Sequence, residues 1–261
     1  MKLSVIVIGY NSWNYLEKNL NSLSFLFNDD NVEIIYVDNA STDKTLSKIK
    51  VLFPSVILIE NTKNRGISVA RNQGINIASG EYIWLLDSDT EAEKRALDTM
   101  LSFMDENPDV GICGSKLFGQ NGAIQASCRV FPTISGKLKA AIHIFGKKLN
   151  LRLYSSFHHQ NTYNKYWETP FEVDYVIGAC QLIRKSAQEK IGLLDEKIFY
   201  GPEDADFCFR MKQAGYKVFY LPQVYLFHAY QRVSSHKIFS KLTREHLKGL
   251  IYYFWKHRGG R

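Results

Sequence analysis

Asp87, Ser88 and Asp89 are the residues of this chain best suited to chemistry. They directly follow the apolar run 82–86, which predicts a buried strand. Two carboxylates one residue apart repel each other, and a cation between or beside them relieves the repulsion. Mg²⁺ or Mn²⁺, held by one or two carboxylates and by substrate phosphates, suits this arrangement. The alternative is a turn in which Asp89 caps the next helix.

A second acidic motif, Glu203-Asp204-Ala205-Asp206, opens a predicted amphipathic helix in the last third of the chain. Acids are favoured at a helix N-terminus, which is one explanation of the motif. The other is chemical, because a carboxylate beside an acceptor hydroxyl is what a general base requires. His228 ends a predicted strand, where a neutral imidazole is either structural or a metal ligand.

Three more residues lie where strands end or helices begin. Asp38 follows the apolar run 33–37 and can accept the N3–H of uracil or thymine. The alternative is that the motif only caps the next helix, through Ser41 or Asp43. Gly9 ends the first predicted strand without a side chain, so either a base or ribose approaches the backbone or an ordinary turn forms there. Arg71 lies early in a predicted helix, where its planar guanidinium either reaches a diphosphate or lies in solvent.

These candidates are positioned by alternating strands and helices in the first half of the chain. We expect strands at 3–8, 33–37, 56–60 and 82–86, and helices at 13–27, 43–52 and 67–78. This alternation predicts a parallel sheet flanked by helices, with ligands at the carboxyl ends of the strands. Further strands are expected at 216–220 and 224–227. The long polar and aromatic segment 132–170 resists assignment, and such loops are usually functional or mobile.

The composition is ordinary for a globular protein: 261 residues, 45% hydrophobic and 23% charged. No apolar run approaches the roughly 18 residues of a membrane span, and the apolar N-terminus reads as a first strand. The four cysteines include no C-x-x-C pair, so we expect buried reduced thiols.

The positive charge is concentrated at the C-terminus. Residues 236–261 hold seven Lys/Arg and one Glu, which is +6 of the formal +7, so a general nucleic-acid-binding surface is not indicated. This segment predicts a basic amphipathic helix that either docks on the inner face of a membrane or packs on its own domain. Its apolar positions are Ile238, Leu242, Leu247, Leu250, Ile251 and Phe254; its interleaved basic positions are Lys237, Lys241, Arg244 and Lys248; its interfacial aromatics are Tyr252, Tyr253 and Trp255.

The order of the motifs resembles a family-2 inverting glycosyltransferase of the GT-A fold. The resemblance rests on five motifs: Val5-Ile6-Val7 with Tyr10-Asn11, Val37-Asp38-Asn39-Ala40-Ser41-Thr42-Asp43, Asn64-Arg65-Gly66 with Ala70-Arg71-Asn72-Gln73-Gly74, Asp87-Ser88-Asp89, and Glu203-Asp204-Ala205-Asp206. The stretches 173–180, 191–196 and 252–257 are similar to the bacterial branch that includes rhamnosyltransferases. The similarity spans residues 3–260 apart from the insert 132–170.

The resemblance implies a role for each candidate. Asp89 would ligate Mn²⁺ or Mg²⁺ directly, Asp87 would contact the ribose or reach the metal through water, and His228 would complete the metal shell. Asp204 would be the base, and Asp38 would hold a pyrimidine with Tyr10 packed near it. The nucleotide-binding residues implied are Gly9, Tyr10, Asn11, Asp38, Asn39, Arg71, Asp87 and Ser88. The acceptor-binding residues implied are Gly178, Ala179 and Glu203.

The expected protein is therefore an α/β enzyme of the GT-A type, with a Rossmann-like, mostly parallel sheet and a smaller mixed acceptor region. We expect a glycosyltransferase domain at 1–231, with a nucleotide-sugar half at 1–110 and an acceptor half at 111–231, followed by the C-terminal helix at 232–261. It would move a sugar from dTDP-rhamnose or a UDP-sugar to a hydroxyl of a glycan or lipid-linked acceptor in bacterial surface polysaccharide synthesis. We expect it in the cytoplasm, with peripheral attachment to the inner membrane face through 236–261.

Two other functions stay open. A sugar nucleotidyltransferase also uses paired acids and a metal, but would carry a Gly-rich basic loop after the first strand, which residues 9–12 lack. A carbohydrate-binding protein without turnover is the second, and the intact Asp87, Asp89 and Asp204 argue against it. A dinucleotide dehydrogenase is disfavoured, since no G-x-G-x-x-G follows any predicted strand.

Overall fold

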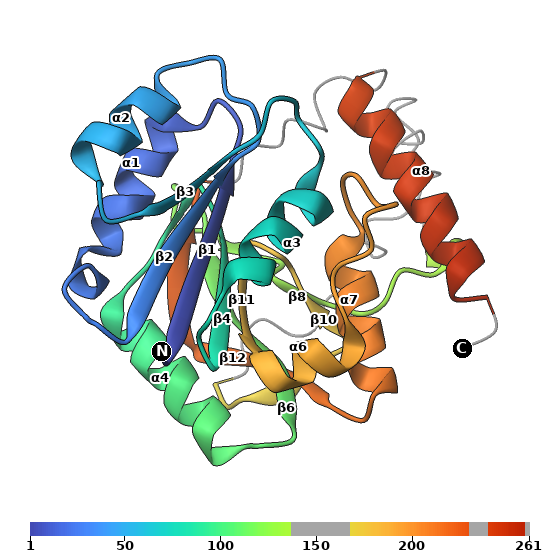
Figure 1. Ribbon diagram of the computed structural model, residues 1–261. Coiled ribbons are helices and arrows are strands. Elements are labelled where there is room, and N and C mark those ends of the chain that lie inside the picture. Colours follow the sequence, from blue (N-terminus) through green and yellow to red (C-terminus); the bar gives the residue numbers. More distant parts are fainter. Residues whose placement is uncertain (137–167, 230–239, 259–261) are drawn as a thin grey trace.

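The first half of the chain alternates strands and helices as predicted (Figure 1). The computed structural model describes residues 1–136, 168–229 and 240–258. Strands β3, β2, β1 and β4 pair in that order, and all are parallel. The elements are β1 (Leu3–Gly9), α1 (Trp13–Ser22), η1 (Ser24–Leu26), β2 (Val32–Asp38), α2 (Thr45–Leu52), β3 (Ile57–Glu60), α3 (Ile67–Ile77) and β4 (Tyr82–Asp87).

The second half extends the same sheet in the order β4-β11-β6-β12-β5. Strand β11 runs antiparallel to β4 and β6, whereas β12 runs parallel to β6. The expected mixed α/β fold with a mostly parallel sheet is confirmed. The elements are β5 (Thr90–Glu91), α4 (Lys94–Glu106), β6 (Val110–Phe118), β7 (Ile124–Gln125), β8 (Cys128–Arg129), β9 (Phe171–Glu172), β10 (Tyr175–Val176), β11 (Cys180–Arg184), α6 (Lys185–Ile191), α7 (Glu203–Gln213), β12 (Lys217–His228) and α8 (Lys241–Lys256).

One predicted helix and one predicted pair of strands differ clearly from the structure. The helix expected at 13–27 ends at Ser22, whose hydroxyl donates to the Asn19 carbonyl and accepts from Ala92 N–H, and a 3₁₀ turn follows. The two strands expected at 216–220 and 224–227 are one strand, β12, with a register shift between Leu221 and Tyr225. Pro222 lies inside this shift, where its missing N–H removes a ladder hydrogen bond.

The sheet is buried on both faces, which explains why its central strands are continuously apolar. In β4, Trp84 and its even-numbered neighbours pack with α1 and α4, while Ile83 and Leu85 pack with α3, α6 and α7. All four cysteines are buried and free, as predicted. The core therefore holds the strand ends rigidly at the edge where Asp38 and Asp87 emerge.

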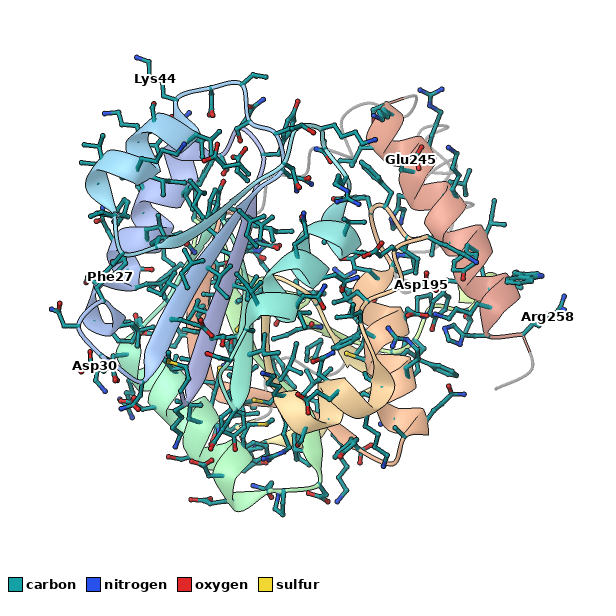
Figure 2. All side chains as sticks on the ribbon, in the orientation of Figure 1. Phe27, Asp30, Lys44, Asp195, Glu245 and Arg258 are labelled. Atoms are coloured by element: carbon teal, nitrogen blue, oxygen red, sulfur yellow. The ribbon has the colours of Figure 1, made fainter. Side chains whose placement is uncertain are left out.

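Helix α8 packs one side on the protein and leaves another apolar side in solvent. Leu250 and Tyr253 are buried, whereas Leu247, Ile251 and Trp255 are 57%, 62% and 57% exposed. Figure 2 places Asp195 between α7 and α8, and Glu245 on α8. Lys237, Ile238 and the insert residues 137–167 lie outside the described part of the chain. Among the described residues, every helix is too short or too polar to span a bilayer.

Candidate active site

The predicted site residues gather where β1, β2 and β4 end. Gly9 pairs with Asp38 across β1 and β2, and Ile8 pairs with Asp87 across β1 and β4. The two carboxylates therefore flank the end of β1. This edge is where open α/β sheets bind ligands.

Asp87, Asp89 and His228 form a group that could hold a metal ion. One ligand atom from each lies within 4.8 Å of the others. Strand β12 brings His228 opposite Thr90 of β5. Thr90 directly follows residues 87–89, which we call the acidic turn, and Ser88 within this turn is half-buried. Two carboxylates offer the oxygen ligands that Mg²⁺ and Mn²⁺ prefer, and the imidazole adds a nitrogen.

Gln125 fixes the ring orientation of His228. Its amide nitrogen donates to the His228 carbonyl at 2.8 Å, so its oxygen faces the ring and accepts from Nδ1 at 2.7 Å. The Nε2 atom then points at Asp89 Oδ1, 3.3 Å away. Burial lowers the pKa of His228, but the hydrogen bond and charge of Asp89 outweigh it, so the pKa is raised overall. When His228 is protonated, its Nε2 carries a proton that is hydrogen-bonded to Asp89. A metal ion that binds Nε2 would have to displace this proton.

Arg71 is buried beneath the acidic turn. Its Nη2 donates to Asp87 Oδ1 at 2.8 Å and to the Gly178 carbonyl at 2.9 Å, and its Nη1 donates to Glu203 Oε1 at 3.1 Å. Burial alone would lower the pKa of Arg71, but the charges of Asp87 and Glu203 raise it. Both terminal nitrogens are engaged by protein groups, so contact with a diphosphate stays a prediction.

Gly178 and Ala179 serve the site through their backbones. The Gly178 N–H lies 3.4 Å from Asp204 Oδ2, while its carbonyl accepts from Arg71. A Cβ at Gly178 would lie 2.3 Å from Arg71 Nη1, so a larger residue cannot be accommodated without a shift. The Ala179 carbonyl accepts from Thr90 Oγ1 at 3.2 Å and supports the acidic turn. Their predicted contacts with an acceptor are untested.

Glu203 and Asp204 begin α7 but have different surroundings. Glu203 is buried, and burial together with the charge of Asp204 outweighs Arg71 and raises the pKa of Glu203 to about 7. Its second oxygen, Oε2, has no hydrogen-bond partner. Asp204 is half-buried and accepts from Ala205 N–H at 2.7 Å. Asp204 is thus the accessible carboxylate of the pair, as a general base must be.

Asp38 offers one free acceptor atom at the other side of the site. The residue is fully buried; its Oδ2 accepts from Ser41 N–H at 2.7 Å, and its Oδ1 has no hydrogen-bond partner. Asn39 instead uses both ends of its amide on the protein, with Arg65 N–H on the oxygen and the Gly66 carbonyl on the nitrogen. Asn39 therefore holds the loop before α3 in place.

The loop after β1 also has a structural component. A Cβ at Gly9 would lie 2.3 Å from both Ser12 Oγ and Tyr36 Oη, so packing already requires glycine there. The Asn11 side chain accepts from Thr42 N–H at 2.7 Å and links the two loops. Tyr10 is 51% exposed and is available to a ligand.

A family model described as "Glycosyl transferase family 2" matches residues 4–192. The chain belongs to this family. As a family-2 glycosyltransferase it is 26% identical over 269 residues to an N-acetylglucosaminyl-diphospho-decaprenol L-rhamnosyltransferase of Mycobacterium tuberculosis (strain CDC 1551 / Oshkosh), covering 98% of this chain and 85% of the relative. The family match ends before Asp204 and His228 and therefore does not cover these two residues.

Solved glycosyltransferases share the fold. GalNAc-T7 with UDP, GalNAc and Mn²⁺ superposes with a TM-score of 0.67 at 16% identity, over 98% of this chain; this chain spans 48% of that one. The mannosyltransferase PcManGT from Pyrobaculum calidifontis, in complex with GDP-Man and Mn²⁺, superposes with a TM-score of 0.65 at 21% identity. The superposition covers 100% of this chain and 65% of the mannosyltransferase chain. The GT-A assignment is confirmed.

Two residues that support the site of this family-2 glycosyltransferase, Asn19 and Gln125, were not predicted from the sequence. Asn19 of α1 is fully buried and donates to the Thr90 carbonyl at 2.6 Å, which supports the acidic turn from below. Its signal was a polar residue among the apolar positions Leu16, Leu20 and Leu23. Gln125 had no such signal, since it lies in a two-residue strand far from His228 in sequence.

Proposed function

We propose that this glycosyltransferase moves a sugar from a nucleoside-diphosphate donor to a hydroxyl with inversion, and that it depends on Mn²⁺ or Mg²⁺. The observation that carries the proposal is the chain Asp87–Arg71–Glu203, which joins the Asp-Asp-His group to the helix that bears Asp204. Donor and acceptor sites must lie side by side for a direct displacement. A single base on the acceptor side leads to inversion.

Asp87, Asp89 and His228 would hold the metal, which would neutralise the charge that develops on the departing diphosphate. Asp38 would accept the N3–H of uracil or thymine on Oδ1, the buried atom that lacks a protein partner. Tyr10 would pack on the base. UDP- and dTDP-sugars are therefore the donors favoured by this site, and the two solved relatives with Mn²⁺ support the metal.

Asp204 would take the proton of the acceptor hydroxyl. It is half-buried and lies at the N-terminus of α7, so it can reach both the protein interior and an incoming ligand. Gly178 N–H would hold the unused oxygen, and Gly178, Ala179 and Glu203 would form the wall next to the acceptor. The name of the mycobacterial relative, a rhamnosyltransferase with a decaprenol-linked substrate, supports a dTDP-rhamnose donor and a lipid-linked acceptor in surface polysaccharide synthesis.

A lipid-linked acceptor would require the enzyme to meet a membrane, and α8 supplies a suitable surface. We call Leu247, Ile251 and Trp255 the apolar stripe; they lie four residues apart and are all more than half exposed. Lys248 follows Leu247 in sequence, and the guanidinium of Arg258 lies 5.6 Å from the ring centroid of Trp255. Such a helix would lie on an anionic inner leaflet, with each basic residue contributing about 1 kcal/mol.

The decisive experiment is a donor screen. Purified protein would be incubated with Mn²⁺ and each nucleotide sugar, with a lipid-linked acceptor or with water alone, and nucleotide release would be measured. We expect release from a uracil or thymine donor, greater with acceptor. Release of pyrophosphate from a nucleoside triphosphate and a sugar phosphate would instead identify a nucleotidyltransferase, and no turnover with any donor would contradict the proposal.

A further inference from the structure

We infer that Asp206 is a positioning residue for this reaction, through which α8 holds the catalytic helix α7 in place. The inference rests on the proposed function, because it takes Asp204 as the base. It assigns α8 a role inside the catalytic unit in addition to any contact with a membrane.

Asp206 is a buried carboxylate with three partners. Its exposed fraction is 0%, and its Oδ1 accepts from Lys256 Nζ at 2.7 Å and from His257 Nε2 at 2.8 Å. Its Oδ2 accepts from Arg210 Nε at 2.9 Å, one turn along α7. Compensation of the helix dipole needs neither full burial nor partners on another helix. Two of the three partners come from the end of α8.

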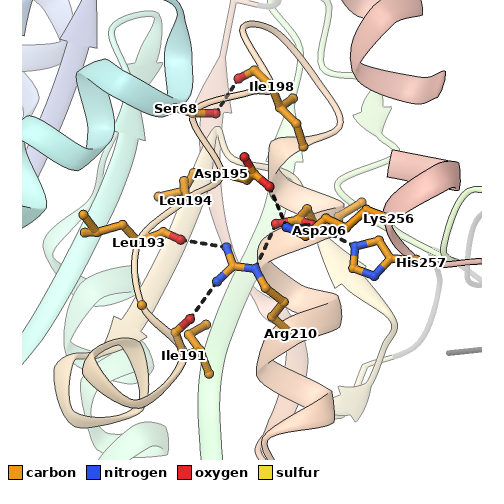
Figure 3. Close-up of polar contacts among 12 residues, drawn as sticks. Ser68, Ile191, Leu193, Leu194, Asp195, Ile198, Asp206, Arg210, Lys256 and His257 are labelled. Carbon is orange, nitrogen blue, oxygen red and sulfur yellow. Dashed lines mark hydrogen bonds and ion pairs between the residues drawn. The ribbon is translucent and has the colours of Figure 1, made fainter. Parts of the chain in front are cut away.

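The same contacts reach the loop that leads into α7 (Figure 3). Lys256 Nζ also lies 2.7 Å from Asp195 Oδ2, which accepts from Tyr252 as well. Arg210 donates to the carbonyls of Ile191 and Leu193 at 2.9 and 2.8 Å. The loop, α7 and α8 are therefore connected by one network of charged and polar side chains, which we call the Asp206 network: Asp195, Asp206, Arg210, Tyr252, Lys256 and His257.

A second contact lies nearer the start of α8. A Cβ at Gly249 would lie 2.5 Å from the Gly201 carbonyl, and a Cβ at Gly201 would lie 2.9 Å from His246 Nδ1. The two backbones thus meet two residues before Glu203. Since α8 touches the chain both before and inside the first turn of α7, it determines where that turn lies.

The geometry of α7 carries this constraint to the base. Asp204 and Asp206 are two residues apart, so their side chains project about 200° apart around the helix. Asp204 faces Gly178 and Asp206 faces α8. Loosening the Asp206 network would let the first turn of α7 move as a unit, and a displacement of about 1 Å at a reacting group can cost a hundredfold in rate.

The test compares Lys256→Met, which removes the bridging charge, with Lys256→Arg, which keeps it. Lys94→Met is the matched control, because Lys94 forms an exposed pair with Asp98 on α4. For each folded variant we would measure kcat for transfer, KM and Kd for the donor, and amide hydrogen exchange of residues 199–206. Tyr252→Phe, which removes one hydroxyl, is the milder second variant if Lys256→Met does not fold.

We expect Lys256→Met to lower kcat between about 10- and 100-fold with donor Kd within about twofold, and to speed exchange at 199–206. Lys256→Arg should recover most of the rate, Tyr252→Phe should show a smaller loss of the same kind, and Lys94→Met should match the wild type. Unchanged kcat and exchange in both Lys256→Met and Tyr252→Phe, or equal losses of donor binding and kcat, would overturn the inference. If the wild type transfers no sugar, the proposed function fails, whereas the exchange measurement still tests the contact between α8 and α7.

Discussion

Arg71 donates to Asp87 at 2.8 Å from a position inside the protein where only 2% of its side chain is exposed. A buried arginine at this place ties the acidic turn 87–89 to the core, and its other nitrogen does the same for Glu203. Asp87 and Glu203 are thereby both held by one buried side chain. Removing Arg71 would leave the buried Glu203 without its cationic partner, and breaking a buried pair in this way typically costs about 3–5 kcal/mol.

Asp89→Ala should lower turnover at least about a hundredfold, because the variant loses a ligand of the ion that stabilises the leaving group. It should also weaken Mn²⁺ binding in the presence of nucleoside diphosphate, measured by calorimetry. Asp98→Ala, which removes an exposed acid on α4, is the control. Full activity of the Asp89 variant in EDTA would contradict the metal assignment.

Asp204→Asn should strongly slow transfer while leaving donor binding intact, because the amide keeps the shape of the side chain and removes its basicity. A general base contributes about 10²–10⁴-fold, which is the expected loss in kcat. Donor affinity would be measured by calorimetry. If the rate stays near that of the wild type, the base lies elsewhere, and Glu203 is the next candidate because Asp206 is fully engaged.

Gly178→Ala should destabilise the protein, because its new methyl group would lie 2.3 Å from Arg71 Nη1. Overpacking of this kind costs about 1–3 kcal/mol, which thermal unfolding would detect. Gly119→Ala is a milder comparison, since its Cβ would lie 3.1 Å from Asn121 Oδ1, 3.3 Å from Gln125 Nε2 and 3.6 Å from the Ala123 carbonyl. Equal melting temperatures for the two variants would show that Arg71 can move aside.

The stability of the wild type should fall relative to Glu203→Gln as the pH rises from 5 to 8. The folded-state pKa of Glu203 is raised from 4.5 to about 7, so the folded protein binds this proton more tightly than the unfolded chain does. The resulting stabilisation is complete below pH 4.5 and is lost as the pH rises through 7. We expect a difference of about 1–3 kcal/mol in urea unfolding without metal. Parallel pH profiles would mean that Glu203 is ionised throughout.

Replacing the apolar stripe (Leu247, Ile251 and Trp255) by serine should reduce co-sedimentation with anionic vesicles at low salt. Exposed apolar side chains enter the interface, whereas the basic residues provide an attraction that salt screens. Val51→Ser with Ile77→Ser is the matched control, since both side chains are exposed on other helices. Absence of wild-type binding at low salt, or equal binding of both variants, would leave α8 with its packing role alone.

The sequence by itself determined the alternation of strands and helices, and with it the edge at which Asp38 and Asp87 lie. This was predictable because the central strands are buried on both faces, so their apolar runs end where the chain leaves the core. The acidic motif at 87–89 could be assigned to a strand end for the same reason. The order of five motifs then indicated the family.

Only the tertiary structure decided which of these side chains meet. Arg71 and Glu203 are 132 residues apart in sequence, and no local pattern shows that the arginine points inward to bind that carboxylate. The same holds for Gln125 and His228, which are 103 residues apart. The helix at the C-terminus was recognisable from its charge and apolar spacing, but spacing cannot distinguish a stripe that packs from one that stays exposed. Whether a side of the helix is packed depends on the surface it meets. Here that surface includes Gly201 and Asp206, which only folding brings against α8.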